Sequence, residues 1–205
     1  MNKNNSNMSL ADKLTILRIL LIPVFVSLLF YFNEARLYLR YVLLAVFGIA
    51  VLTDFFDGLV ARIKKEKSEI GQVIDPLADK LLLLTAFIAL YALRKSLPLN
   101  HEIPLWVVLI IVSRDLIILL GVMILYFMKI EIPIAPSMWG KFTTFFQMIT
   151  VLSVIMDIPF SNFIWILAVI FTLISGVGYF TRGVKSINTK IIRQDKPTHN
   201  KSCEK

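Results

Sequence analysis

Residues 104–128 read PLWVVLIIVSRDLIILLGVMILYFM, and this run decides the class of fold. A transmembrane helix needs about 20 mostly apolar residues to cross the hydrocarbon core of a bilayer. Similar apolar runs occupy residues 14–32, 38–62, 76–93, 141–158 and 163–183. None of them alternates apolar and polar residues, as the strands of a membrane barrel do. The sequence therefore predicts an all-α polytopic membrane protein with six transmembrane helices.

The overall composition supports a membrane protein. Apolar residues make up 57% of the 205 residues, and charged residues make up 18%. Soluble domains are usually about 45–50% apolar and about 25% charged. The excess needs a second apolar solvent, which a bilayer provides. We expect one six-helix domain over residues 1–189, followed by a polar, basic tail at 190–205 that is disordered.

The distribution of basic residues predicts the orientation. Six spans place both termini on one side of the membrane, together with the connections at 62–75 and 129–141. Most lysines and arginines fall on that side, so it is predicted to be cytoplasmic. We attribute the net charge of +8 to segments that face anionic lipid headgroups, and we do not expect nucleic-acid binding. The predicted location is the plasma or inner membrane.

An acidic motif joins the second and third apolar runs. It reads DFFDGLVAR from Asp54, then eight residues, then GQVIDPLAD up to Asp79. Asp54 and Asp57 are three residues apart, and Asp75 and Asp79 are four apart. On a helix, both spacings place side chains on one face. Because the two helices are antiparallel neighbours, we expect the four carboxylates to converge at their cytoplasmic ends.

Four converging carboxylates require compensation. Like charges at close range raise one another's pKa, and acidic residues in a membrane are costly unless they have a function. Carboxylate oxygens suit Mg²⁺, Mn²⁺ or Ca²⁺ better than zinc, and Mg²⁺ also binds substrate phosphates. The motif therefore predicts a divalent-metal site for a diphosphate substrate. One structural alternative is that Asp75, followed by Pro76, caps the start of a helix.

Small residues surround the acidic motif. Gly58 and Gly71 have no side chain and Ala61 has a short one, so a ligand such as a cytidine ring can approach the backbone closely. Arg62 presents a rigid fork of donors to a carboxylate or a phosphate. The alternative for Arg62 is that its side chain extends to the inner membrane interface.

The complete pattern resembles the signature of a known family. Asp54-x2-Asp57-Gly58-x2-Ala61-Arg62-x8-Gly71-x3-Asp75-x3-Asp79 is similar to the signature of the CDP-alcohol phosphatidyltransferases. The resemblance implies a homodimer of six-helix subunits, each with a polar cavity open to the cytoplasm. It also implies phospholipid biosynthesis, with CDP-diacylglycerol as the donor and a lipid membrane as the environment.

The resemblance implies specific roles for the motif. Two Mg²⁺ or Mn²⁺ ions are implied, and their ligands are Asp54, Asp57, Asp75 and Asp79. Asp79 is implied to act also as the general base on the acceptor hydroxyl. The CDP site is implied to be lined by Gly58, Ala61, Arg62, Gly71 and Thr15.

Three basic residues outside the motif bear on the acceptor. Arg114, Lys141 and Arg182 come from three different runs and together predict a site for a phosphorylated acceptor. Alternatively, each extends to the membrane interface or forms an ion pair, as Arg114 does if it contacts Asp115 or the acidic motif. The region resembles the branch of the family whose acceptor is glycerol-3-phosphate or phosphatidylglycerol. The glycerol-3-phosphate enzymes usually have a second lysine where Thr143 stands, so phosphatidylglycerol remains an alternative acceptor.

Other functions are less consistent with the sequence. An ion-coupled transporter predicts acidic residues near the bilayer midplane and paired halves, whereas these aspartates cluster at the ends of two consecutive runs. His101 lies in a connection far from the motif and is expected to be an ordinary surface residue.

Overall fold

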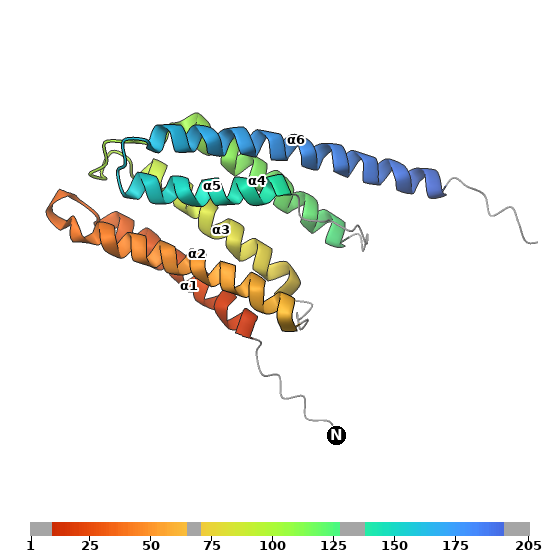
Figure 1. Ribbon diagram of the computed structural model, residues 1–205, viewed down its shortest axis with the longest axis horizontal. Helices are drawn as coiled ribbons and strands as arrows, with labels where there is room; N and C mark the ends of the chain where they lie inside the picture. The colour runs from red at the N-terminus through yellow and green to blue at the C-terminus, as the bar shows by residue number, and fades with distance from the viewer. Residues whose placement is uncertain (1–9, 65–70, 128–137, 195–205) are drawn as a thin grey trace, which may run out of the picture.

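The computed structural model describes residues 10–64, 71–127 and 138–194 (Figure 1). Within these ranges, the side chains of 54–64, 71–79 and 182–194, and of a few residues elsewhere, lie outside the description. The α-helices are α1 (Leu10–Tyr31), α2 (Tyr38–Lys64), α3 (Gly71–Ala92), α4 (Leu105–Phe127), α5 (Met138–Ile155) and α6 (Ser161–Gln194). A short 3₁₀ turn, Glu34–Arg36, joins α1 to α2, and these ranges contain no strand. The all-α prediction is confirmed, and each helix overlaps one of the predicted runs.

Consecutive helices run in opposite directions (Figure 1). The connections α1–α2, α3–α4 and α5–α6 lie at one end of the bundle. The C-terminal ends of α2 and α4 and the N-terminal ends of α3 and α5 lie toward the other end. Helix α1 packs against α2 and α3, α4 packs against α3 and α6, and α5 packs mainly against α6 and also touches α2 and α3. This arrangement brings the helix ends that carry the acidic motif and Lys141 to the same end of the molecule.

Large apolar side chains hold α1, α2 and α3 together. Phe25, Phe47 and Phe87 are fully buried, and the ring centroids of Phe25 and Phe47 are 5.5 Å apart. In a bilayer, lipid tails are as apolar as these rings, so the contacts stabilise the bundle through close van der Waals packing. The apolar core therefore fixes the helices that carry the motif relative to one another.

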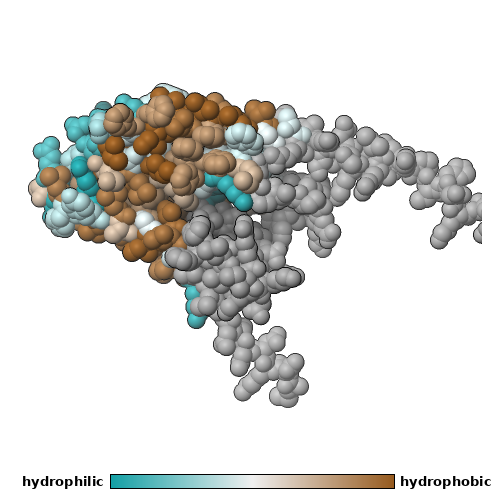
Figure 2. Space-filling view, viewed as in Figure 1, coloured by the Kyte–Doolittle hydropathy of each residue, from teal (hydrophilic) through white to brown (hydrophobic). Residues whose placement is uncertain are grey.

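The outer surface of the bundle is also apolar. Large hydrophobic side chains such as Ile117, Phe163 and Val177 are more than 60% exposed. Figure 2 shows hydrophobic residues across the middle of one face, with hydrophilic residues gathered at the end that holds the α1–α2, α3–α4 and α5–α6 connections. Two segments of the described chain, Met138–Ile155 and Ser161–Tyr179, are long and apolar enough to cross a membrane. These features indicate a membrane protein.

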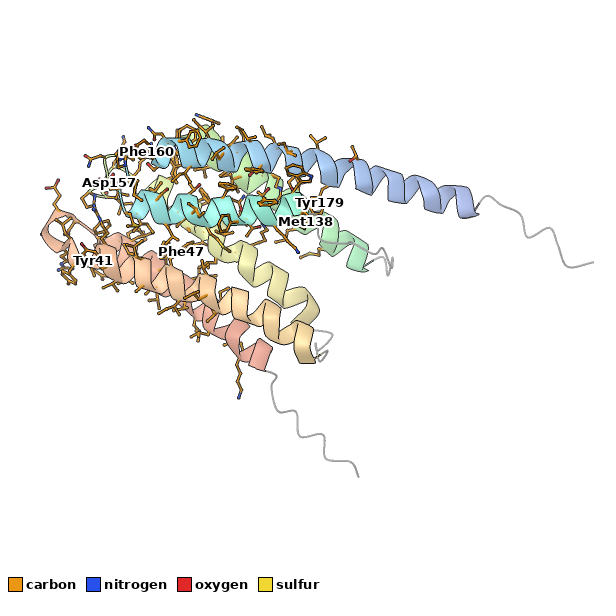
Figure 3. The ribbon with its side chains drawn as sticks, viewed as in Figure 1. Tyr41, Phe47, Met138, Asp157, Phe160 and Tyr179 are labelled. Carbon is orange, nitrogen blue, oxygen red and sulfur yellow. The ribbon has the colours of Figure 1, made fainter. Side chains whose placement is uncertain are left out.

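A cluster of hydrogen bonds joins two connections at the end opposite the motif. Asp157 adopts a positive φ of 56° and lies between α5 and α6 (Figure 3). Its carboxylate accepts hydrogen bonds from the backbone N–H groups of Asn100 and His101 at 2.9 and 3.1 Å. The Asn100 side-chain amide donates at 2.6 Å, and His101 Nδ1 lies 2.9 Å from the carboxylate. The prediction that His101 is an ordinary surface residue is therefore wrong, because its ring links the α3–α4 and α5–α6 connections.

The protonation of Asp157 reflects this cluster. Partial burial tends to raise the pKa of the Asp157 carboxyl group, but hydrogen bonds from His101 and Asn100 outweigh burial and hold the pKa below its usual value. Each bond favours the ionised form because the N–H donor stabilises the negative charge of the carboxylate. The link between the two connections is therefore complete at neutral pH.

The last helix is longer than the sequence analysis predicts. Helix α6 has 34 residues, which corresponds to about 51 Å at 1.5 Å per residue. The predicted run ends at residue 183, whereas the helix continues to Gln194 and extends beyond the other helices (Figure 1). The helix thus includes residues 190–194, which the sequence analysis assigned to the tail. Residues 195–205 of that tail lie outside the described ranges.

Candidate active site

The backbone of the acidic motif lies on two consecutive helices. Asp54 and Asp57 fall in the last eleven residues of α2, and Asp75 and Asp79 fall in the first nine residues of α3. Only residues 65–70 separate these helices, so the end of α2 and the start of α3 are close along the chain and lie at the same end of the bundle (Figure 1). The side chains of the four aspartates lie outside the description, so their convergence on metal ions stays a prediction.

The start of α3 bears on the structural alternative for Asp75. The helix begins at Gly71, four residues before Asp75. Asp75 therefore occupies the second turn of the helix, and Pro76 follows it inside the helix rather than at its first position. The alternative that Asp75 caps the helix is not supported, and the spacing of four that places Asp75 and Asp79 on one helical face is present in the observed helix.

The residues predicted to line the CDP site are distributed over three helices. Gly58, Ala61 and Arg62 lie on α2 and Gly71 begins α3, and their side-chain environments lie outside the description. Thr15 on α1 is described and is 2% exposed. It makes a polar or electrostatic interaction within the protein. Its burial is consistent with a position inside the bundle, and its contact with the nucleotide stays a prediction.

Arg18 is a buried cation that the sequence analysis did not include among the site residues. It lies one helical turn after Thr15, is 1% exposed and also makes an interaction within the protein. Helix α1 packs against α2 and α3, the helices that carry the motif. The signal was present in the sequence, because an arginine between Leu17 and Ile19 in an apolar run is costly without a function.

Arg114 lies at the centre of a polar network that joins three helices. Its Nη1 donates to Asp115 Oδ1 at 2.5 Å, and its Nη2 donates to the hydroxyl of Ser175 on α6. On the other side, Nζ of Lys80 on α3 donates to Asp115 Oδ2 at 3.0 Å. The guanidinium carbon also lies 5.7 Å from the ring centroid of Tyr179 on α6. The Asp115 side chain is fully buried.

Two alternatives for Arg114 followed from the sequence, namely an ion pair with Asp115 and a contact with the acceptor phosphate. Arg114 does pair with Asp115, as the structural alternative proposed. A guanidinium has five N–H donors, however, and the two hydrogen bonds above use only two of them. Its Nε is buried and has no hydrogen-bond partner among the described side chains. The two hydrogen bonds therefore fix the position of Arg114 without using all of its donors, and its contact with an acceptor phosphate stays a prediction.

The start of α5 packs next to this network. A Cβ atom on Gly140 would lie 3.4 Å from the Tyr179 hydroxyl and 3.7 Å from the Ser175 hydroxyl. Figure 3 labels Met138 at the start of α5 and Tyr179 on α6. Lys141 is exposed and follows Gly140 directly. The structure thus brings Arg114 and the backbone at Lys141 to the same stretch of α6.

Arg182 is the third residue of the predicted acceptor site. It lies seven residues after Ser175 on the continuous helix α6, so its α-carbon falls on the same helical face as that of Ser175. The side chain of Arg182 lies outside the description. Its participation in the acceptor site stays a prediction.

One buried amide, on α5, has no hydrogen-bond partner among the described residues. Gln147 on α5 is fully buried, and neither its Oε1 nor its Nε2 has a hydrogen-bond partner in the described part of the chain. Thr143 and Thr150, on the same face of α5, instead donate to backbone carbonyls. An unsatisfied buried amide costs about 1–3 kcal/mol.

Comparison with known proteins identifies the family. The profile of the CDP-alcohol phosphatidyltransferase family matches residues 8–174. A probable phosphatidylglycerophosphate synthase from Mycobacterium tuberculosis is 35% identical over 187 residues, which cover 87% of this chain and 83% of the relative. A CDP-diacylglycerol--glycerol-3-phosphate 3-phosphatidyltransferase from Bacillus subtilis is 31% identical over 198 residues, which cover 88% and 98%. One of the same name from Rickettsia typhi is 34% identical over 182 residues, which cover 84% and 95%. The chain therefore belongs to the CDP-alcohol phosphatidyltransferase family and is an enzyme that transfers phosphatidyl groups.

Proposed function

We propose that this enzyme transfers the phosphatidyl group of CDP-diacylglycerol to glycerol-3-phosphate, giving phosphatidylglycerophosphate and CMP. The structural observation that supports glycerol-3-phosphate as the acceptor is the position of Arg114. Its guanidinium is held between α4 and α6, beside the start of α5, and Asp115 links it to the helix that carries Asp75 and Asp79. The names of the relatives support the same donor and acceptor.

The acceptor site binds the phosphate of glycerol-3-phosphate. Arg114 offers its unused N–H donors, and Lys141 and Arg182 add positive charge from α5 and α6. Hydrogen bonds between ionised partners are about twice as strong as neutral ones, and a guanidinium binds phosphate oxygens in pairs. The phosphate anchors the acceptor, so its free hydroxyl is presented toward the donor.

The donor site uses the motif on α2 and α3. Asp54, Asp57, Asp75 and Asp79 form an all-carboxylate donor set that suits two hard divalent cations, Mg²⁺ or Mn²⁺. When bound, these ions neutralise the diphosphate and stabilise the departing CMP. Gly58, Ala61 and Gly71 leave room for the cytidine. Arg62 and Thr15 contribute polar contacts to the CDP group.

The proton of the acceptor hydroxyl goes to Asp79. The acceptor oxygen forms a bond to the phosphorus on the lipid side, the bond from that phosphorus to the bridging oxygen breaks, and CMP leaves. Asp79 accepts the proton as the new bond forms, which is the role of a general base. The protein otherwise contributes position and charge, as in other phosphoryl transfers.

The enzyme works at the inner face of the membrane. All six helices cross the bilayer, both termini face the cytoplasm, and two subunits associate as a homodimer. Residues 1–189 form the catalytic domain, and the tail follows at 190–205. This orientation is supported by the excess of lysine and arginine on one side, which is also the end that carries the motif and the start of α5.

Phosphatidylglycerol is the second acceptor that the sequence allows, and its use would make the enzyme a cardiolipin synthase. The comparisons do not favour it, because the named relatives are synthases of phosphatidylglycerophosphate or transferases to glycerol-3-phosphate. An ion-coupled transporter is inconsistent with membership of a phosphatidyltransferase family.

An assay with each acceptor in turn distinguishes the two candidate reactions. Purified enzyme in lipid nanodiscs receives CDP-diacylglycerol and Mg²⁺ or Mn²⁺, with glycerol-3-phosphate, phosphatidylglycerol or neither. The proposal predicts release of CMP and formation of phosphatidylglycerophosphate with glycerol-3-phosphate alone. Formation of cardiolipin from phosphatidylglycerol, with no product from glycerol-3-phosphate, would contradict it.

A further inference from the structure

We propose that Asp115 is a positioning residue for the acceptor site. Its buried carboxylate fixes Arg114 of α4 relative to Lys80 of α3, and so holds the phosphate-binding guanidinium in register with the helix that carries Asp79. This inference rests on the proposed function, because it assigns the acceptor phosphate to Arg114. Asp115 itself acts through Arg114 and does not contact the acceptor.

The two oxygens of the Asp115 carboxylate bind cations on two different helices, α4 and α3. Oδ1 of Asp115 accepts from Arg114 Nη1 at 2.5 Å, and Oδ2 accepts from Lys80 Nζ at 3.0 Å. Lys80 follows Asp79 directly in the sequence. A displacement of α3 relative to α4 therefore changes the distance between Asp79, the proposed base, and Arg114, the proposed phosphate ligand.

Burial makes this arrangement rigid. The Asp115 side chain is fully buried, Arg114 is 10% exposed and Lys80 is 19% exposed. Water competes little for these groups, so the electrostatic attraction is stronger than at a surface. On the far side of the guanidinium, Ser175 accepts from Nη2. A Cβ atom added to Gly176 would lie 3.7 Å from Cγ of Arg114, so the stem of the side chain passes close to α6. Arg114 is held at both ends of its fork.

The contacts of Arg114 use only some of the guanidinium donors. Asp115 and Ser175 accept from the two Nη atoms, whereas Nε is buried without a partner among the described side chains. A single monodentate contact to the carboxylate leaves more donors than a bidentate pair would. The carboxylate therefore orients Arg114 without saturating it.

The test compares Michaelis constants for the two substrates. Asp115→Asn keeps the shape of the side chain but removes its charge, so Arg114 and Lys80 lose their shared ionised partner. We expect the KM for glycerol-3-phosphate to rise about tenfold or more, because a displaced guanidinium loses a charged hydrogen bond to the acceptor phosphate. The KM for CDP-diacylglycerol should change less than about threefold, since Asp115 acts on the acceptor side. Asp115→Glu, which restores the charge, should recover part of the affinity for glycerol-3-phosphate.

Glu102→Gln is the matched control. Glu102 forms an exposed ion pair with Arg94 at 3.7 Å at the opposite end of the bundle, so the same loss of charge there should change neither KM. If Asp115→Asn does not fold, Ser175→Ala tests the other anchor of Arg114 without removing a buried charge. It should raise the same KM to a smaller extent.

Each outcome decides the inference. An unchanged KM for glycerol-3-phosphate in Asp115→Asn, or in Ser175→Ala where the first variant does not fold, would overturn it. A lower KM would also overturn it, because Asp115 would then compete with the phosphate for Arg114. An equal rise in both Michaelis constants would show a general structural role and overturn it too. If the wild-type enzyme itself does not use glycerol-3-phosphate, the proposed function fails first, and this result is distinct from a failure of Asp115.

Discussion

Replacing Arg114 with lysine tests the acceptor site while keeping its charge. The guanidinium reaches Asp115 with one nitrogen and Ser175 with another, and it lies over the ring of Tyr179. A lysine ammonium is a single point on a flexible stem and keeps only one of these anchors. The substitution therefore loses one anchor inside the protein and, with it, one of the N–H donors that the guanidinium offers to the acceptor phosphate.

The size of the effect follows from that loss. A hydrogen bond to a charged group contributes about 1.5–3 kcal/mol, and 1.4 kcal/mol corresponds to about tenfold. We expect the kcat/KM for glycerol-3-phosphate to fall by about tenfold to about 150-fold in Arg114→Lys. Most of the change should lie in the KM, since the interaction binds the acceptor in both the ground state and the transition state.

The assay follows transfer of radiolabelled glycerol-3-phosphate into the lipid phase at saturating CDP-diacylglycerol. Arg94→Lys is the control, because Arg94 lies at the opposite end of the bundle, where its side chain forms a hydrogen bond and a cation–π contact with Tyr91 and an ion pair with Glu102. It should leave kcat/KM unchanged. A value for Arg114→Lys within twofold of the wild-type value would refute the assignment of Arg114 to the acceptor phosphate.

Three further predictions concern other residues. Asp79→Asn should lower kcat by about 100-fold or more, since a general base contributes about that much, while thermal unfolding in detergent stays unchanged; near-normal turnover would remove Asp79 as the base. Gln147→Met should raise the free energy of unfolding by about 1–3 kcal/mol, because the buried amide has no hydrogen-bond partner among the described residues. A higher Tm would show this, and a lower Tm would show that the amide has a partner. The Asp157 carboxylate has a pKa below its ordinary value of 3.8. Its contribution to stability is therefore present above pH 3.8 and is lost as the pH falls through the lowered pKa. Asp157→Asn should remove this part of the acid-induced loss of Tm, and an unchanged dependence of Tm on pH would contradict the prediction.

The helices could be predicted because hydropathy dominates their formation. Each apolar run became a helix with ends within a few residues of the predicted ones at Tyr31, Tyr38 and Phe127. The two largest differences occur where the helices leave the apolar runs. Helix α3 begins at Gly71 instead of near residue 76, and α6 continues to Gln194. Hydropathy alone does not detect these polar turns, although Val184, Ile187 and Ile191 recur at helical spacing.

The candidate site could be predicted only in part. The acidic motif is local in sequence, so its residues and their helical spacing were readable directly. The contacts of Arg114 and Asp115 could not be predicted, because Lys80 lies 35 residues before Asp115 and Ser175 lies 61 residues after Arg114. Such contacts depend on how α3, α4 and α6 pack, and single-sequence spacing does not encode that packing. The same reason explains why the link between His101 and Asp157, 56 residues apart, was not anticipated.

The most direct measurement follows one labelled acceptor into lipid. Purified enzyme is given CDP-diacylglycerol, divalent metal and ¹³C-labelled glycerol-3-phosphate, and the lipid and aqueous phases are analysed by mass spectrometry. The account predicts phosphatidylglycerophosphate that carries the label, formed in equal molar amount to CMP. Labelled glycerol-3-phosphate that remains wholly in the aqueous phase, under conditions where the Bacillus subtilis relative makes product, would contradict it.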